Sequence, residues 1–152
     1  MLTIADIMTR DVKVIDRQET VADAILAMQT HGLRSLIVDR PSPDLPYGVL
    51  TERDVVYKVF ARNLDPTRVH VQDIMRQPCI AVEPAYTLRE AAVTMADAGI
   101  QRAPVIHNGE LLGVVSVTDL VMKGYVISTV LPRQFITAAH RITYGPLGWA
   151  ER

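Results

Sequence analysis

The feature that most constrains this chain is a tandem internal repeat. The tripeptide Asp-Ile-Met at residues 6–8 recurs at residues 73–75, which lie 67 positions later. Residues 48–54 match residues 113–119 at an offset of 65, and the change of two residues falls in the proline-rich stretch 41–46. Length changes confined to a loop are typical of a repeated structural unit. The chain is therefore expected to contain two copies of one fold unit.

Each copy shows the same order of predicted elements, β-α-β-β-α, so the expected fold class is α+β. The strands are predicted from short β-prone stretches bounded by turn residues, and the helices from apolar residues at helical spacing. Strands are predicted over residues 12–15, 35–38 and 48–50, with counterparts over 79–82, 103–106 and 113–117. Second helices are predicted over about residues 54–61 and 119–124.

The first helix of each copy has clear start and stop signals. Thr20 with Asp23 matches the capping box that begins a helix, and Thr87 with Glu90 is its counterpart in the second copy. A glycine follows the last turn of each helix, as is typical of a C-terminal cap. These signals place the two helices at equivalent points of the repeats.

The repeat divides the chain into four predicted segments. Residues 1–61 form repeat 1, residues 62–70 a polar linker, residues 71–124 repeat 2, and residues 125–152 a C-terminal extension with apolar residues at helical spacing. A unit of about 60 residues is marginally stable on its own. We therefore expect the two repeats to pack with pseudo-twofold symmetry and to leave clefts between them.

Composition excludes several classes of function. Sixteen basic and 17 acidic residues give a formal net charge of −1, which does not favour nucleic acid as a partner. No apolar run is long enough for a membrane helix, and a single cysteine, expected to be buried and unreactive, fits a reducing cytoplasm. The four histidines lack the spacing of metal ligands, and no catalytic motif is present. We expect a cytoplasmic protein that is not an enzyme and has no catalytic cofactor.

A hydroxyl and a carboxylate recur where each repeat passes from a strand into its last helix. Thr51 and Asp54 occupy this junction in the first repeat, and Ser116 and Asp119 occupy it in the second. Free backbone N–H groups at a helix start and a nearby hydroxyl suit a phosphate, and an ionised aspartate can accept hydrogen bonds from ribose hydroxyls. The same spacing is also a capping box, and one residue pair can serve in both roles.

Together these features resemble a pair of CBS domains, also called a Bateman module. The resemblance rests on two copies of Asp-Ile-Met, a helix, a strand such as residues 32–38, and a segment such as residues 48–54, and it covers about residues 3–124. It implies a regulatory module that binds AMP, ADP, ATP or S-adenosylmethionine and usually forms a homodimer. With no effector domain attached, the module would act through that dimer or on a protein partner in trans. The alternative is a dimerisation scaffold that binds no ligand.

The resemblance also extends the predicted site beyond the two junctions. Arg34, Arg53 and Arg102 would supply charge to balance a phosphate, and short strands at residues 13–14 and 80–81 would contact adenine. The repeats differ here, because only the second has the Arg-Ala-Pro-Val pattern of the family, so two sites of unequal affinity are expected. The predicted nucleotide-binding residues are Lys13, Val14, Arg34, Ser35, Thr51, Arg53 and Asp54, and in the second repeat Ile80, Ala81, Gln101, Arg102, Ser116, Thr118 and Asp119.

Overall fold

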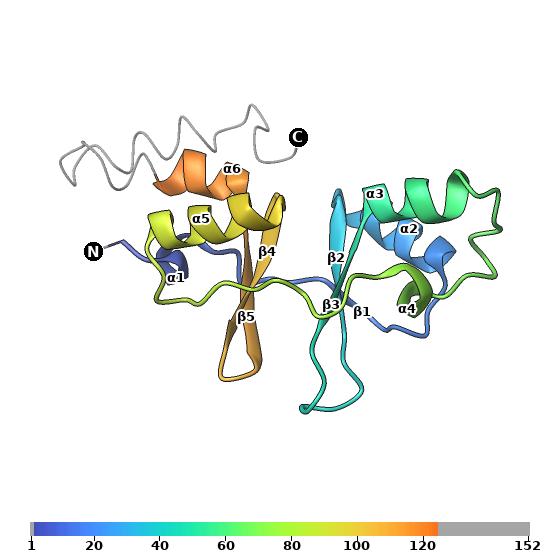
Figure 1. The fold of residues 1–152 in the computed structure, drawn as a ribbon, viewed down its shortest axis with the longest axis horizontal. Coiled ribbons are helices and arrows are strands. Elements are labelled where there is room, and N and C mark those ends of the chain that lie inside the picture. The colour runs from blue at the N-terminus through green and yellow to red at the C-terminus, as the bar shows by residue number, and fades with distance from the viewer. Residues whose placement is uncertain (1, 125–152) are drawn as a thin grey trace. The chain divides into compact units, whose positions relative to one another are not determined.

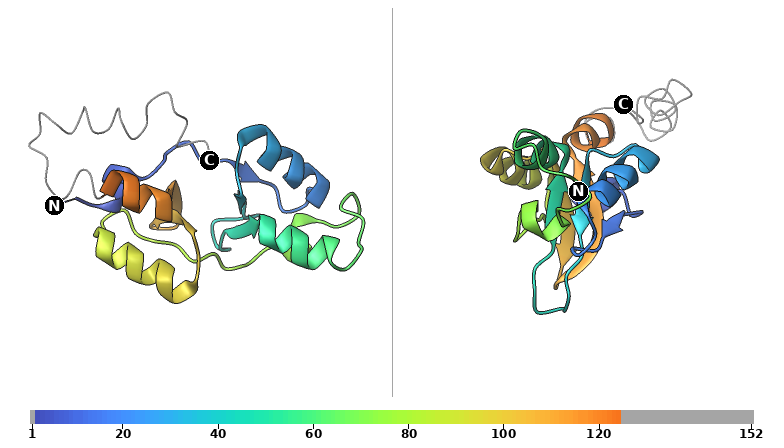
Figure 2. Two further views of the ribbon diagram at one scale, coloured as in Figure 1. Left: turned by 90° about the horizontal axis from the view of Figure 1, so that it is seen from above. Right: turned by 90° about the vertical axis from the view of Figure 1, so that its right-hand side faces the viewer.

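The computed structural model describes residues 2–124, and the C-terminal extension with its predicted helix lies outside the described residues. The chain divides into two compact units (Figures 1 and 2). Residues 11–79 form the central unit, and among the described residues 2–10 together with 80–124 form the terminal unit. Both units combine strands and helices, which confirms the predicted α+β class. None of the helices within residues 2–124 has the length and apolar character needed to cross a membrane.

The central unit contains a three-stranded sheet in the order β1-β2-β3. Strand β1 runs parallel to β2, and β2 runs antiparallel to β3. A cluster of buried apolar side chains, from Ile15 on β1 to Ile74 on α4, joins the sheet to the helices. The elements of this unit are β1 (Val14–Ile15), α2 (Val21–His31), β2 (Ser35–Val38), β3 (Gly48–Thr51), α3 (Glu52–Val55), the π-helix η1 (Val56–Phe60) and α4 (Val71–Ile74).

The terminal unit repeats this plan with a two-stranded antiparallel hairpin. Its core combines side chains of the chain's first residues with those of the second repeat, such as Ile4, Ile7, Val105 and Val115. Its elements are α1 (Ile4–Ile7), α5 (Leu88–Ala98), β4 (Arg102–His107), β5 (Glu110–Ser116), α6 (Val117–Asp119) and the π-helix η2 (Leu120–Gly124).

The strand predicted over residues 79–82 is reduced to one parallel bridge between Val82 and Val105. The prediction was wrong about its length because the Cys79 N–H donates to the Tyr47 carbonyl of the central unit, so the segment pairs with β4 only at Val82. The strand predicted over residues 113–117 ends at Ser116, and Val117 is the first residue of helix α6.

The helix boundaries largely follow the predicted signals. Thr20 and Asp23 form the complete capping box at the start of α2, and Gly32 and Gly99 end α2 and α5 in the left-handed conformation with φ of 63° and 66°. At α5 only half of the predicted box forms: the Thr87 side chain accepts a hydrogen bond from the Glu90 N–H. Thr87 also pairs with Thr3 in an antiparallel bridge, which brings the chain's N-terminal segment to the start of α5.

The Asp-Ile-Met segment that opens each repeat packs in the unit formed by the other repeat. We call residues 2–10 and 71–79 the exchanged segments. In the terminal unit, Thr9 and Val114 exchange two backbone hydrogen bonds of 2.8 and 2.9 Å. In the central unit, Val49 and Arg76 form the same pair at 2.8 and 2.9 Å. The sequence repeats and the compact units therefore do not coincide.

Each exchanged segment passes close to a glycine. A Cβ atom on Gly48 would lie 2.8 Å from the Met75 sulfur, and one on Gly113 would lie 2.9 Å from the Met8 sulfur and 2.7 Å from the Thr9 carbonyl oxygen. Real Cβ atoms do not approach other atoms this closely. The methionine of each Asp-Ile-Met segment therefore packs against a glycine of the other repeat, Met75 against Gly48 and Met8 against Gly113.

We expect the substitution Gly113→Ala to destabilise the protein by about 1–3 kcal/mol, because the added methyl group overpacks against the Thr9 backbone. Urea denaturation followed by circular dichroism measures this change. Gly99→Ala serves as the comparison, because its Cβ meets open space and only the positive φ opposes it, at a cost of about 1 kcal/mol. An unchanged midpoint for Gly113→Ala would show that residues 2–10 are not seated against β5.

Candidate functional site

Ten of the fourteen predicted site residues lie at two equivalent junctions, one where β3 enters α3 beside the start of β2 and one where β5 enters α6 beside the start of β4. Thr51 lies opposite Ser35 in the central sheet, and Ser116 lies opposite Arg102 in the terminal hairpin. The first N–H of each helix donates to the residue just before the neighbouring strand. Glu52 donates to the Arg34 carbonyl before β2, and Val117 donates to the Gln101 carbonyl before β4, both at 2.9 Å. The structure therefore makes Arg34 equivalent to Gln101, and Ser35 to Arg102.

The fourteen predicted residues divide evenly between the two units. Those from Lys13 to Asp54 lie in the central unit, and those from Ile80 to Asp119 lie in the terminal unit. Each unit thus carries its own complete candidate set. We call them the central site and the terminal site.

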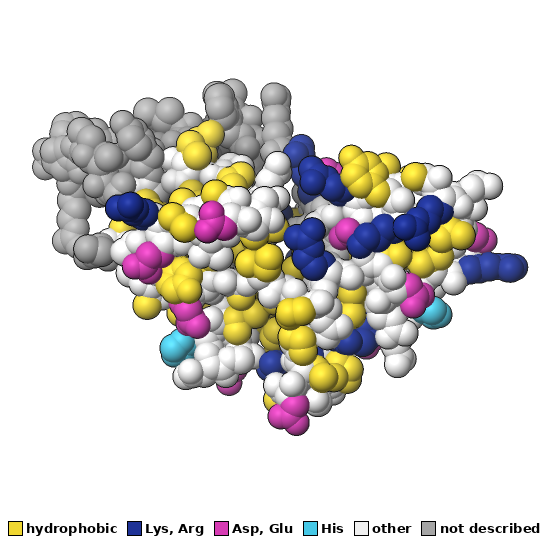
Figure 3. All heavy atoms as spheres, in the orientation of Figure 1, with side chains coloured by type: hydrophobic (Ala, Val, Ile, Leu, Met, Phe, Trp, Pro, Cys, Tyr) yellow, Lys and Arg dark blue, Asp and Glu magenta, His cyan; other side chains and the backbone are white. Residues whose placement is uncertain are grey.

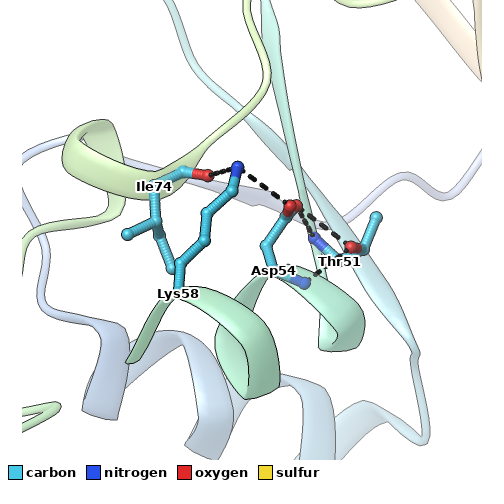
Figure 4. A network of polar contacts seen from close by, with 4 residues as sticks. All are labelled: Thr51, Asp54, Lys58 and Ile74. Atoms are coloured by element: carbon cyan, nitrogen blue, oxygen red, sulfur yellow. Dashed lines mark hydrogen bonds and ion pairs between the residues drawn. The ribbon is translucent and has the colours of Figure 1, made fainter. Parts of the chain in front are cut away.

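Thr51 and Asp54 form a closed capping box in the central site (Figure 4). Oδ2 of Asp54 accepts hydrogen bonds from the Thr51 N–H and the Thr51 hydroxyl, each at 3.0 Å. The Asp54 N–H donates to Thr51 Oγ1 at 3.1 Å. The predicted cap is confirmed. A phosphate that approached Thr51 would compete with Asp54 for the hydrogen bond that the Thr51 hydroxyl donates.

Ser116 and Asp119 repeat this box in the terminal site. Oδ2 of Asp119 accepts from the Ser116 N–H at 2.9 Å, and the Asp119 N–H donates to Ser116 Oγ at 3.1 Å. Both aspartate side chains are shielded from water, with 14% of Asp54 and 15% of Asp119 exposed. Charges shielded in this way interact more strongly than charges in open solvent.

A lysine four residues after each aspartate completes the junction. Lys58 Nζ lies 3.1 Å from Asp54 Oδ1 and donates to the Ile74 carbonyl oxygen at 2.9 Å (Figure 4). Lys123 Nζ lies 3.2 Å from Asp119 Oδ1 and donates to the Ile7 carbonyl oxygen at 3.2 Å. Each lysine therefore joins a site aspartate to an exchanged segment.

Sequence reasoning missed both lysines. The signal was present, because Asp-x-x-x-Lys recurs at the same offset of 65 that relates the two junctions. It was overlooked because a carboxylate and a lysine four residues apart on a helix are usually a solvent-exposed pair of little consequence. Only the fold shows that the second contact of each lysine reaches a distant segment.

The other predicted residues surround the junctions less tightly. Arg34, Arg53, Gln101 and Thr118 are exposed, and Ser35 and Arg102 are half-buried. Exposed side chains of this kind are free to turn toward a ligand, but the structure shows no contact that fixes them in the site. Their role therefore stays a prediction.

The strand segments predicted to contact adenine are accessible in both units. Val14 is exposed although it pairs with Ile37 in the sheet, and Ile80 and Ala81 are half-buried. Lys13 lies beside Asp11, with 3.4 Å between Nζ and the nearer carboxylate oxygen. This pairing offsets part of the charge that Lys13 brings to the central site.

The two sites differ in charge. The predicted central set contains three cationic residues, Lys13, Arg34 and Arg53, whereas the predicted terminal set contains Arg102. Lys and Arg side chains gather on the face of the central unit shown in Figure 3. The predicted central set is therefore the more cationic of the two.

Cys79 was expected to be buried and is only half-buried. Its backbone N–H donates to the Tyr47 carbonyl at 2.9 Å, and it is the last residue of the central unit. Partial burial still raises the pKa of the Cys79 thiol, because the thiolate loses hydration. Within residues 2–124, no group of three or more His, Cys, Asp or Glu side chains is placed to hold a metal ion.

Comparison with known proteins identifies the family of both repeats. The CBS domain family matches the chain twice, over residues 4–61 and 71–124. The chain belongs to the CBS domain family. Among solved structures, the hexameric CBS-CP12 protein from bloom-forming cyanobacteria is 40% identical, with a TM-score of 0.78 over 91% of this chain and 79% of that chain.

Relatives known from sequence support the same family. Hypoxic response protein 1 of Mycobacterium tuberculosis is 30% identical over 120 residues, which are 79% of this chain and 83% of that protein. An uncharacterised protein of Methanopyrus kandleri is 34% identical over 131 residues, and the match spans 85% of this chain but 66% of the relative. CBS-domain pairs are commonly regulatory modules, and the chain is a pair of this kind.

We expect Cys79 to react with iodoacetamide several-fold more slowly than free cysteine at about pH 8, because its raised pKa leaves less thiolate. The rate should continue to rise above about pH 9, where free cysteine levels off. Mass spectrometry of the alkylated protein over time measures the rate. The urea-unfolded protein is the control and should react like free cysteine; equal rates in both states would contradict the burial of the thiol.

Proposed function

We propose that this protein is a non-catalytic regulatory sensor that binds an adenine nucleotide. The observation that carries the proposal is the repeated junction, with its hydroxyl, shielded carboxylate and lysine in the same geometry in both units. A hydroxyl at a helix start suits a phosphate, and a shielded aspartate suits the two ribose hydroxyls. The junctions belong to CBS domains, a family that commonly serves regulation.

The proposed ligand is AMP, ADP, ATP or S-adenosylmethionine. Adenine would lie against the accessible strand segments at residues 13–14 in the central site and 80–81 in the terminal site. With three cationic residues, the central site favours ATP or ADP, and the terminal site favours a ligand of lower charge. No catalytic cofactor is part of this proposal, because binding alone shifts the balance between conformations.

The protein is proposed to act in the cytoplasm, as a homodimer or on a protein partner. Val56, Tyr57 and Phe60 are exposed on η1, directly after the central site. A row of large apolar side chains is typical of a protein contact. The hexameric state of the cyanobacterial CBS-CP12 protein supports a second copy of this chain as the occupant.

A ligand-free assembly scaffold is the second candidate. It is favoured by the closed capping boxes, since Thr51 and Asp54 satisfy one another without any ligand. In that case the aspartates would stabilise helix starts and do nothing more. Ligand titration separates the two functions.

Calorimetric titration with AMP, ATP and S-adenosylmethionine should detect binding of at least one of them. Asp54→Asn should weaken the central site at least tenfold, because the amide cannot accept from both ribose hydroxyls with the strength of a carboxylate. Asp23→Asn is the matched control: Asp23 makes the same contacts with Thr20 at the start of α2 but lies outside the site. Absence of binding by all three compounds would favour the scaffold. If a compound binds and both substitutions weaken it equally, Asp54 acts as a helix cap and does not contact the ligand.

Phe60→Glu should convert the assembled protein to a smaller species, because the introduced carboxylate would lose its hydration in the contact. Light scattering coupled to size-exclusion chromatography measures the mass. Leu26→Glu, which changes another exposed apolar residue on α2, should leave the mass unaltered. A wild-type protein that is monomeric at all concentrations tested would disprove the proposed homodimer.

A further inference from the structure

The chain crosses between the two units at two places, and both crossings carry residues of the candidate sites. One crossing lies between Thr9, which is paired with Val114, and Val14, which begins β1. The other lies between Cys79, whose N–H donates to a carbonyl of the central unit at 2.9 Å, and Val82, whose N–H donates to a carbonyl of the terminal unit at 3.0 Å. Between these fixed points lie Lys13 in the first crossing and Ile80 with Ala81 in the second.

Lys58 holds the segment that leads into the second crossing. Its ammonium group bridges the Asp54 carboxylate of the central site and the Ile74 carbonyl at the end of α4. Six residues later the chain reaches Ile80, a predicted adenine contact of the terminal site. One ion pair, one hydrogen bond and six residues of chain therefore connect the carboxylate of the central site to the terminal site.

Lys123 makes the same connection in the opposite direction. It bridges the Asp119 carboxylate of the terminal site and the Ile7 carbonyl at the end of α1. Six residues later the chain reaches Lys13, a predicted contact of the central site. The connection is thus reciprocal, and it follows the chain itself, so it requires no contact between the two units.

We propose that Lys58 and Lys123 are positioning residues that couple the two sites, so that occupancy of one lowers affinity at the other. This inference rests on the proposed nucleotide-binding function. Ribose hydroxyls that donate to Asp54 compete with Lys58 for the same carboxylate. The lysine then holds Ile74 less firmly, and the segment up to Cys79 gains freedom. A ligand at the terminal site contacts Ile80 and must order this segment again. The entropy lost in that ordering weakens the binding of the ligand.

The anchoring half of this coupling is tested without ligand by amide hydrogen exchange. The reporter amides are those of Arg76 and Cys79, which donate to carbonyls of the central unit at 2.8 and 2.9 Å. Lys58→Met should accelerate their exchange roughly five- to tenfold, the effect of losing one partly shielded charged hydrogen bond. Lys58→Arg should restore protection, since guanidinium can also bridge a carboxylate and a carbonyl.

Arg62→Met is the matched control, because it removes an exposed positive charge one turn further along without touching Asp54 or Ile74. It should leave both reporter amides unchanged. Equal exchange in the wild type and in Lys58→Met would overturn the anchoring role. Equal acceleration in Arg62→Met and Lys58→Met would overturn it too, since a general loss of positive charge would then explain the effect.

The coupling half is tested by titrating AMP, ATP and S-adenosylmethionine in turn while the amide resonances of Thr51 and Ser116 report the occupancy of each site separately. In the wild type, filling one site should weaken the other about fivefold, the lower end of typical site–site coupling. In Lys58→Met this factor should fall toward one. An unchanged factor, or a ligand that strengthens the second site, would overturn the coupling.

Failure of the coupling can be distinguished from failure of the proposed function. If none of the three compounds binds the wild type, the sensor function is overturned and the coupling with it. The ligand-free exchange result then still decides whether Lys58 anchors the exchanged segment. If a compound binds and the coupling factor is one in the wild type, the sensor function stands and the coupling is disproved.

Discussion

The fold depends on the close packing of each exchanged segment against a glycine of the neighbouring strand. Without a side chain, Gly48 and Gly113 let the Met75 and Met8 sulfurs approach to a distance that no Cβ would allow. This approach also brings backbone to backbone, so that Val49 pairs with Arg76 in one unit. The lysine contacts to Ile74 and Ile7 are possible only because these segments are already held in place.

In each candidate site, the same hydroxyl and carboxylate that cap a helix are also the groups proposed to bind the ligand. A helix start needs a side-chain oxygen for its free N–H groups, and Thr51 and Ser116 provide it. A nucleotide would use the same hydroxyl and the same carboxylate. The hydroxyl and the carboxylate of each junction already bond within the capping box, so a ligand must offer stronger partners than those it replaces. This favours ligands with charged phosphates and with two ribose hydroxyls.

Much of the fold could be predicted from local signals. The repeat, the helix caps at Thr20 and the two strand–helix junctions were found because each depends on residues that are close in sequence. The exchange of segments could not be predicted, because nothing local distinguishes packing on one copy from packing on its twin. Both segments read Asp-Ile-Met, so either one could fit against the glycine of either repeat. The second contacts of Lys58 and Lys123 were missed for the same reason, since they follow from the exchange.

The exchange also sets the order in which the chain can complete its folding. The central unit is one continuous stretch, residues 11–79, and all of its packing partners are available once that stretch has been synthesised. The terminal unit joins the first residues of the protein to residues 80–124, so α1 has no core to join until the second repeat has emerged from the ribosome. Because domains form as their chains appear, residues 2–10 are synthesised before the central unit but join their own core after it. During that interval the apolar side chains of Ile4 and Ile7, fully buried in the finished protein, stay exposed to the cell.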